Sequence, residues 1–220
     1  MTVKITVKIW DIPIRVFHWS LVGLLGGLWW SADAGEMELH QIFAYCLLVL
    51  LVVRIIWGFV GSDTARFSDF VRSPKAAINY LRGSLTPNTL GHNPAGGYMV
   101  VMMLLVLLVQ LVTGLFATDD IMTEGPLYYL ASSEQSRWLN WLHKTNFTLL
   151  QVLVVCHILA VVVHQLKGER LIQAMFSGNK PQNEKLKTPE MKPSWWAAGL
   201  FLGLSVIIGY YLIWPIYQYL

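Results

Sequence analysis

Five long apolar runs alternate with polar connections along the chain. They span about residues 14–32, 39–60, 98–117, 132–166 and 195–215. As a helix, each run is long enough to cross a hydrocarbon core about 30 Å thick. The connections between the runs hold most of the charged residues. The pattern therefore predicts an all-α integral membrane protein in which five helices span the bilayer.

Local signals refine the polar connections. Ser73 and Pro74 are typical of a helix N-cap and first turn, and Gly83 is typical of a helix end. We therefore expect a short surface helix between them. The glycine- and proline-rich segment 91–97 is interpreted as a loop. Residues 1–13 are interpreted as a short polar arm that leads into the first span.

Composition agrees with a membrane location, and the charges predict an orientation. The chain is 55% hydrophobic and only 13% charged, whereas soluble domains carry about 25% charged residues. Of the 16 Lys and Arg residues, only Arg137 and Lys144 fall outside the arm, the 61–97 and 167–193 connections and the adjoining helix ends. The positive-inside rule then places the N-terminus in the cytoplasm and, after five spans, the C-terminus outside. We expect membrane lipid, and no nucleic acid, around this chain.

The fourth run contains three histidines, His143, His157 and His164, on one face. His143 and His157 are 14 residues apart, so on a helix they share a face at depths that differ by about 21 Å. The capping-box residues Ser132 and Gln135 mark the start of this helix. On the second run, His40 and Arg54 repeat the 14-residue spacing. Ionisable residues inside spans are functional candidates by default because burying them is costly.

Depth predicts how the histidines pair. His18 lies near the cytoplasmic end of the first span, and His40 enters the second span from outside. These two therefore also differ in depth by about 21 Å. The match pairs His40 with His143 near the outer face, and His18 with His157 near the inner face. If His164 took the place of His157, the difference in depth from His143 would be about 31 Å, which fits the difference between His18 and His40 less well.

Two facing imidazoles, present twice, suit axial ligation of haem iron in a bundle core. The spans offer no carboxylate or thiolate cluster that would favour zinc or a di-iron site. Cys46 and Cys156 are far apart in apolar runs, and no C-x-x-C-H motif for covalent haem attachment is present. The two pairs therefore predict two haems, each held without a covalent bond between two histidines.

Three further residues have open roles. Arg54 falls near the depth of the inner haem, where it either pairs with a propionate or snorkels to the cytoplasmic boundary. His164 is an interfacial histidine, a propionate partner, or the ligand in place of His157. His92 falls in the 91–97 loop and is interpreted as a polar turn residue rather than a ligand.

Several motifs together resemble one known family. They are WDIPIRVFHWS at 10–20, LH at 39–40, RIIWGFVGSDTARF at 54–67, GHNPAGG at 91–97, TGLF at 113–116, and LH and CH ending at 143 and 157. The chain is similar in these residues to the bacterial cytochrome b561 and nickel–iron hydrogenase cytochrome b-subunit family. The resemblance covers about residues 8–176 and implies a four-helix bundle that holds two b-type haems on His18, His40, His143 and His157. Residues 177–220 would add a cytoplasmic linker and a fifth transmembrane helix.

The resemblance implies electron transfer across the bacterial inner membrane. The expected partners are a quinone pool, with quinone as a possible second cofactor, and a periplasmic cytochrome c or oxidoreductase subunit. One alternative is a stand-alone quinone-coupled oxidoreductase, such as a superoxide oxidase. Another is a transporter that uses the histidines as a proton or cation relay, although its spans would lack carboxylates.

Overall fold

The computed structural model describes the chain except residues 1–4, 85–88, 90, 120–122, 183–187 and 219–220. The five long helices are α1 (Ile12–Asp33), α2 (Met37–Val60), α5 (Pro94–Gly114), α6 (Ser133–Leu166) and α8 (Trp195–Ile208). Shorter elements are β1 (Ile5–Lys8), α3 (Phe67–Phe70), α4 (Pro74–Leu81), a 3₁₀ turn (Tyr128–Leu130), α7 (Leu171–Ser177), β2 (Asn179–Gln182), a π-helical segment (Gly209–Ile213) and α9 (Trp214–Tyr217).

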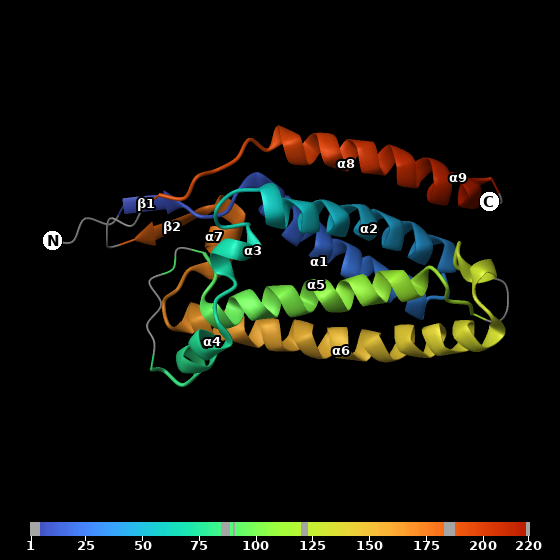
Figure 1. Ribbon diagram of the computed structural model, residues 1–220, viewed down its shortest axis with the longest axis horizontal. Coiled ribbons are helices and arrows are strands. Elements are labelled where there is room, and N and C mark those ends of the chain that lie inside the picture. Colours follow the sequence, from blue (N-terminus) through green and yellow to red (C-terminus); the bar gives the residue numbers. More distant parts are fainter. Residues whose placement is uncertain (1–4, 85–88, 90, 120–122, 183–187, 219–220) are drawn as a thin grey trace.

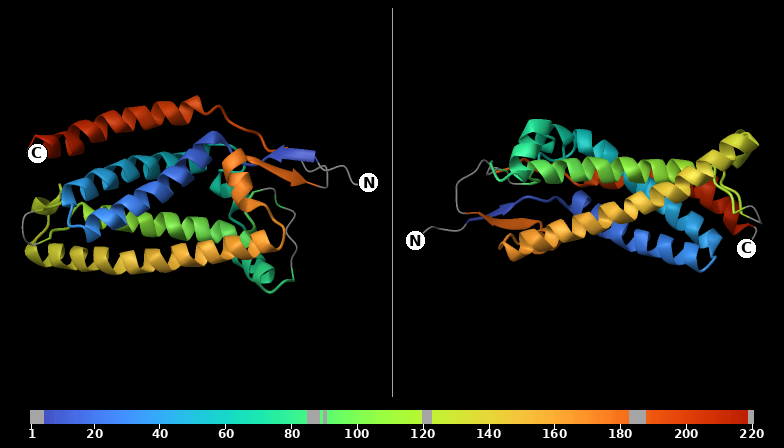
Figure 2. Two further views of the ribbon diagram at one scale, coloured as in Figure 1. Left: turned by 180° about the vertical axis from the view of Figure 1, so that it is seen from behind. Right: turned by 90° about the horizontal axis from the view of Figure 1, so that it is seen from below.

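Helices α1, α2, α5 and α6 form a four-helix bundle (Figures 1 and 2). The closest packing is within the pairs α1–α2 and α5–α6, and α2 joins the two pairs through α5. Leu21, Leu51, Leu107 and Leu150 bring one buried side chain from each helix into a common core. On α2, Arg54 lies on this inward face and is only 4% exposed. Arg54 and Leu51 therefore both lie on the side of α2 that faces the bundle.

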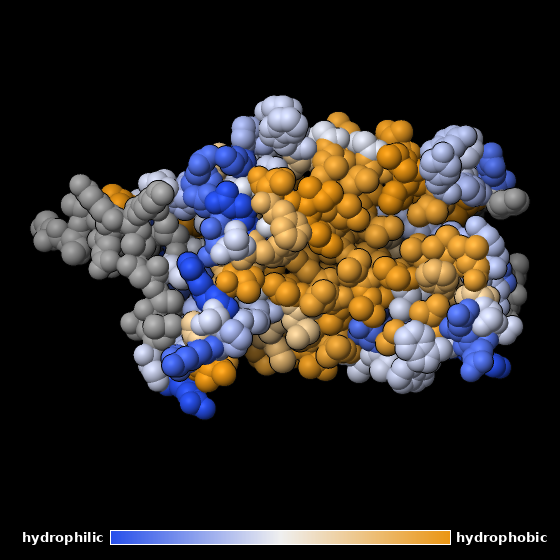
Figure 3. Space-filling view, viewed as in Figure 1, coloured by the Kyte–Doolittle hydropathy of each residue, from blue (hydrophilic) through white to orange (hydrophobic). Residues whose placement is uncertain are grey.

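The two ends of the bundle differ in charge. One end holds the starts of α1 and α5 and the ends of α2 and α6, together with α3, α4, α7 and both strands (Figure 1). Because most Lys and Arg residues lie there, we call it the basic end. The opposite end, where α1 meets α2 and α5 meets α6, is called the acidic end. Figure 3 shows a continuous hydrophobic band between hydrophilic ends.

Helix α8, the π-helical segment and α9 form a fifth apolar rod outside the bundle, beside α2 (Figure 1). Within the described residues, five helical segments are long and apolar enough to cross a membrane, and the last runs from Trp195 to Tyr217. The predicted all-α membrane fold is thus confirmed. Trp195 and Trp196 are more than 60% exposed at the start of the rod, as expected of an interfacial belt.

Capping residues set the helix starts that the sequence indicates. Ser73 accepts a hydrogen bond from the Ala76 amide at the start of α4, and Ser132 and Gln135 form a complete capping box on α6. The loop prediction over 91–97 is wrong in part, because α5 already begins at Pro94. Asn93 caps it through the Gly96 amide, so Asn-Pro starts a helix here despite the glycines that follow.

The predicted polar arm contains a strand that the sequence did not indicate. β1 pairs antiparallel with β2, with Ile5 opposite Gln182. Beyond the strand, the amides of Ile9 and Trp10 both donate to the carbonyl oxygen of Gly178 at 2.8 and 3.0 Å. Ile9 and Trp10 are buried. This small two-stranded element therefore closes the basic end of the bundle.

Candidate functional site

The imidazoles of His18 and His157 face each other across the bundle near its basic end. His18 lies two turns into α1, and His157 lies on α6. Their ring centroids are 6.4 Å apart and the ring planes are inclined by 55°. Imidazole–metal bonds are about 2 Å long, so two rings that ligate one metal ion from opposite sides have centroids about 6 Å apart. The pair is therefore spaced for an ion between the rings.

A second pair, His40 and His143, lies near the acidic end, close enough to interact electrostatically. His40 Nδ1 is 3.0 Å from the carbonyl oxygen of Leu28, and His143 Nδ1 is 2.9 Å from that of Gln110. A carbonyl oxygen only accepts, so each Nδ1 carries the proton. Each Nε2 then presents a lone pair, the state in which a neutral imidazole binds a metal ion.

Polar residues of α5 and α6 fix the orientation of His143. Thr113 Oγ1 lies 3.2 Å from His143 Nδ1. Asn146 donates to the Val106 carbonyl oxygen at 3.0 Å and to Gln110 Oε1 at 2.7 Å. Gln110 and Thr113 stand out in the sequence as polar residues of an apolar run, but the run alone does not indicate that they surround a histidine.

The His18–His157 pair has a different environment. Six buried side-chain nitrogen or oxygen atoms have no hydrogen-bond partner among the described residues, and all belong to the basic end. They are in Arg15, His18, Trp19, Arg54, His92 and Gln165. Buried polar groups are normally paired, so unpaired atoms at one end of the bundle indicate a place for polar groups beyond the chain itself.

Of these six groups, the charged guanidinium of Arg54 has the highest free-energy cost of unpaired burial. It is 4% exposed, its guanidinium lies 5.2 Å from the Phe67 ring centroid, and its NH1 group has no described partner. Asp11 is the anion that acts on it electrostatically. The Asp11 oxygens, however, accept hydrogen bonds from the Ile14 amide and the Trp57 indole. An unpaired buried cation is strongly unfavourable, so the geometry favours an additional anion beside Arg54.

Comparison with protein families agrees with this geometry. A model of the family described as prokaryotic cytochrome b561 matches residues 9–178. The chain belongs to this family. Comparisons with curated proteins and with solved structures return no match. Membership and the membrane-spanning helices make this chain a bacterial membrane protein that transfers electrons through b-type haem.

The side chains present fit that cofactor. Within the described ranges no three His, Cys, Asp or Glu side chains converge as a metal site, whereas imidazole pairs are present and suit the ligation of haem iron. Arg54 offers a cation to the carboxylates that every b haem carries. When bound, haem supplies an iron that accepts and returns one electron at a time. The chain would supply the imidazole ligands, and hydrogen bonds from Nδ1 of His40 and His143 would fix the orientation of two of them.

His92 belongs to the site region, although its place in a short turn gave no sign of this. Its ring lies edge-on to Trp10, with centroids 4.7 Å apart, and is tilted against Phe70 at 4.5 Å. Burial lowers the pKa of His92 to about 3, and the nearby Arg54 and His157 act in the same direction. The imidazole is therefore neutral at physiological pH.

His164 lies in the last turn of α6, apart from both pairs. Its Nδ1 is 2.8 Å from a Glu169 carboxylate oxygen and its Nε2 is 3.4 Å from the Tyr80 hydroxyl. Lys180 also reaches Glu169, at 3.4 Å. Both nitrogens of His164 therefore have partners within the chain. This favours the interpretation of His164 as an interfacial histidine.

Proposed function

We propose that this chain carries electrons across the bacterial inner membrane through two b-type haems. His18 and His157 would ligate one haem, and His40 and His143 the other. The proposal is supported by two imidazole pairs, one near each end of the bundle: the rings of His18 and His157 face each other, and His40 lies close enough to His143 to act on it electrostatically. Fourteen residues of α6 separate the pairs, which corresponds to about 21 Å along the helix.

Arg54 has a specific role in this proposal. Its guanidinium would pair with a propionate of the haem on His18 and His157. The support is its burial and its NH1 group, which lacks a partner in the described structure. A snorkelling arginine, the other reading of this residue, would reach the aqueous boundary with its charged group. The guanidinium of Arg54 instead lies inside the bundle.

The charge distribution supports an orientation of the chain in the membrane and a side on which the soluble partner would bind. The basic end would face the cytoplasm, with the N-terminus on that side and the C-terminus in the periplasm. The electron path would connect a quinone or quinol in the membrane with a periplasmic cytochrome c or oxidoreductase subunit at the acidic end. Both partners are redox molecules, as required of an electron carrier with haem as its only proposed redox group.

The proposal divides the chain into two functional parts. Residues 8–176 would hold both haems within the four-helix bundle. Residues 177–220 would add a linker and the fifth span, which contacts α2 from outside the bundle. The four proposed ligands all lie in α1, α2 and α6, so the fifth span would not contribute to haem binding.

The experiment that tests the proposal is a haem count and a reduced absorbance spectrum on the purified full-length chain. We expect two low-spin b haems per chain. His143→Leu should remove only the haem near the acidic end, and His157→Leu only the haem near the basic end. His164→Leu is the matched control and should retain both, because its partners are Glu169 and Tyr80.

One haem per wild-type chain would contradict the proposal, as would a folded His143→Leu or His157→Leu variant that keeps or loses both haems. The partner assignment has its own measurement. In vesicles, a quinol should reduce the haems, and a soluble cytochrome c added at the acidic face should reoxidise them. Reoxidation from the basic face alone would reverse the proposed orientation.

A further inference from the structure

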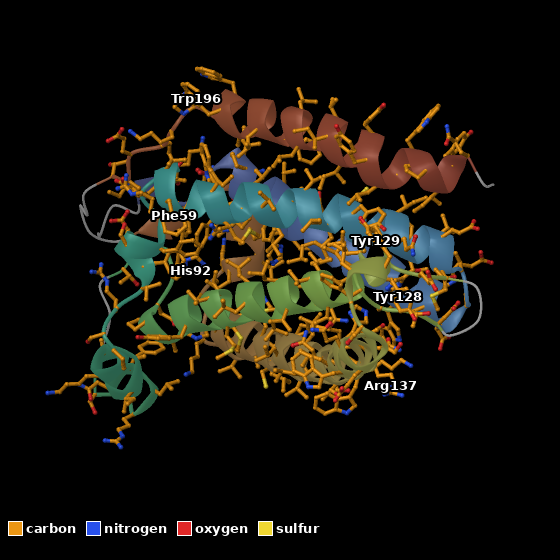
Figure 4. All side chains as sticks on the ribbon, turned by 45° about the vertical axis from the view of Figure 1, so that its right-hand side comes forward. Phe59, His92, Tyr128, Tyr129, Arg137 and Trp196 are labelled. Carbon is orange, nitrogen blue, oxygen red and sulfur yellow. The ribbon has the colours of Figure 1, made fainter. Side chains whose placement is uncertain are left out.

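His92 occupies an enclosed position that the proposed haem ligation does not use. It lies at the end of the bundle opposite Tyr128, Tyr129 and Arg137 (Figure 4). Trp10 and Phe70 hold its ring on two sides. The Nδ1 atom is sealed from solvent and has no hydrogen-bond partner among the described residues.

The neighbours of His92 include a buried guanidinium and a second imidazole. Arg54 and His157 are both close enough to act on it electrostatically. Arg54 also has an unpartnered buried nitrogen, and its neighbouring anion, Asp11, already accepts from Ile14 and Trp57. One buried nitrogen of Arg54, near the end of α2, and one of His92, in the turn before α5, thus lack a hydrogen-bond partner among the described residues. An anionic oxygen ligand would satisfy both.

The backbone around His92 keeps the imidazole in place without its ring nitrogens. Asn93 caps α5 through the Gly96 amide. A Cβ atom on Gly97 would lie 2.8 Å from the Phe70 carbonyl oxygen, so the glycine lets α5 approach α3 closely. The turn is therefore held by the cap and by this close contact, and the ring of His92 is free to serve a ligand.

We propose that His92 donates a hydrogen bond from its ring to a propionate carboxylate of the haem held by His18 and His157, and that Arg54 pairs with the same carboxylate. This inference rests on the proposed dihaem function. His92 and Arg54 together form a carboxylate clamp, defined here as these two side chains. The clamp anchors the haem edge and offsets the negative charge of the propionate.

The clamp has an electrostatic consequence. A propionate whose charge is less well compensated stabilises the oxidised, more positive state of the iron. Loss of the His92 donor should therefore lower the midpoint potential of the haem near the basic end and weaken its retention. The haem on His40 and His143 lies about 21 Å away along the bundle and should keep its potential.

The experiment compares His92→Phe with His164→Phe in the full-length, haem-loaded protein. His92→Phe retains a flat ring between Trp10 and Phe70 but has no N–H group. His164→Phe removes a half-buried histidine at the same end that already has partners in Glu169 and Tyr80. The measurements are a redox titration of each haem, and resonance Raman bands of the propionate groups, which respond to hydrogen bonding. His92→Gln, which can donate from its amide, serves as the rescue variant.

We expect His92→Phe to lower one of the two midpoint potentials and to shift the propionate band, with partial recovery in His92→Gln and no change in His164→Phe. Selective loss of the haem near the basic end would support the clamp in the same way. Two haems with unchanged potentials and bands in His92→Phe would overturn it while leaving the dihaem function intact. Wild-type protein without haem on His18 and His157 would overturn the proposed function, and the clamp with it.

Discussion

His143 of α6 packs its imidazole directly against the backbone of Gly114 in α5. A Cβ atom built on Gly114 would lie 3.0 Å from His143 Cε1. His143 Nδ1 also donates a hydrogen bond to the Gln110 carbonyl oxygen at 2.9 Å. The position of this proposed ligand therefore depends on a glycine in the neighbouring helix.

Gly114→Ala should displace the His143 ring and weaken haem binding near the acidic end. Gly26→Ala is the matched control, because nothing lies within 4 Å of its added Cβ. Overpacking costs about 1–3 kcal/mol, whereas Gly→Ala at an open helical site is favourable by about 0.5–1 kcal/mol. Haem occupancy and thermal unfolding in detergent would check this. Equal behaviour of the two variants would show that the Gly114 contact is unimportant.

Arg54→Leu should weaken haem retention without lowering the stability of the haem-free chain. Removing an unpaired buried cation leaves the haem-free protein equally stable or more stable. A charge-assisted hydrogen bond contributes about 1.5–3 kcal/mol, so the haem near the basic end should be retained about tenfold to a hundredfold less tightly. Thermal unfolding of haem-free protein and haem transfer to an acceptor protein measure the two effects. A haem-free Arg54→Leu chain that is strongly destabilised would mean that Arg54 has an internal structural role.

The buried hydrogen bond between Trp57 and Asp11 should stabilise the basic end. The Trp57 indole donates to Asp11 Oδ2 at 2.8 Å, and Asp11 is 2% exposed. Trp57→Phe leaves that oxygen without its partner, which should cost about 1–3 kcal/mol. Trp195→Phe, at a residue 62% exposed, should cost much less. Chemical unfolding of both variants tests the difference, and equal losses would argue against this bond.

The ion pairs around Glu169 should loosen at low pH. Although burial raises the pKa of Glu169, the hydrogen bond from His164 and the charge of Lys180 outweigh burial and bring it below the usual 4.5. A lowered folded-state pKa means that the pairs stabilise the fold above pH 4.5 and are lost as the pH falls through the folded value. Hydrogen exchange of α7 and β2 should therefore quicken on acidification, and Glu169→Gln should remove that pH dependence. A dependence that persists in Glu169→Gln would place its origin elsewhere.

Much of the bundle could be predicted because its signals are local. Apolar run length determines the spans, and Ser132 with Gln135 determines the start of α6. Spacing was also sufficient to propose the pairing of His18 with His157, because α-helical rise converts residue number into depth. The strand pairing of Ile5 with Gln182 was missed, because the partner lies far along the chain and neither segment alternates clearly.

The sequence by itself determined the membrane location, the spans and which histidines share a depth, because hydropathy and helical periodicity act within one segment. Only the tertiary structure decided what surrounds those histidines. It placed Gly114 and Gln110 against His143, left Arg54 buried with no carboxylate bonded to it among the described residues, and packed His92 against Trp10 and Phe70. Such contacts form where separate helices pack together. Hydrogen bonds and burial between distant segments produce no periodic pattern in the sequence, so they could not be predicted from it.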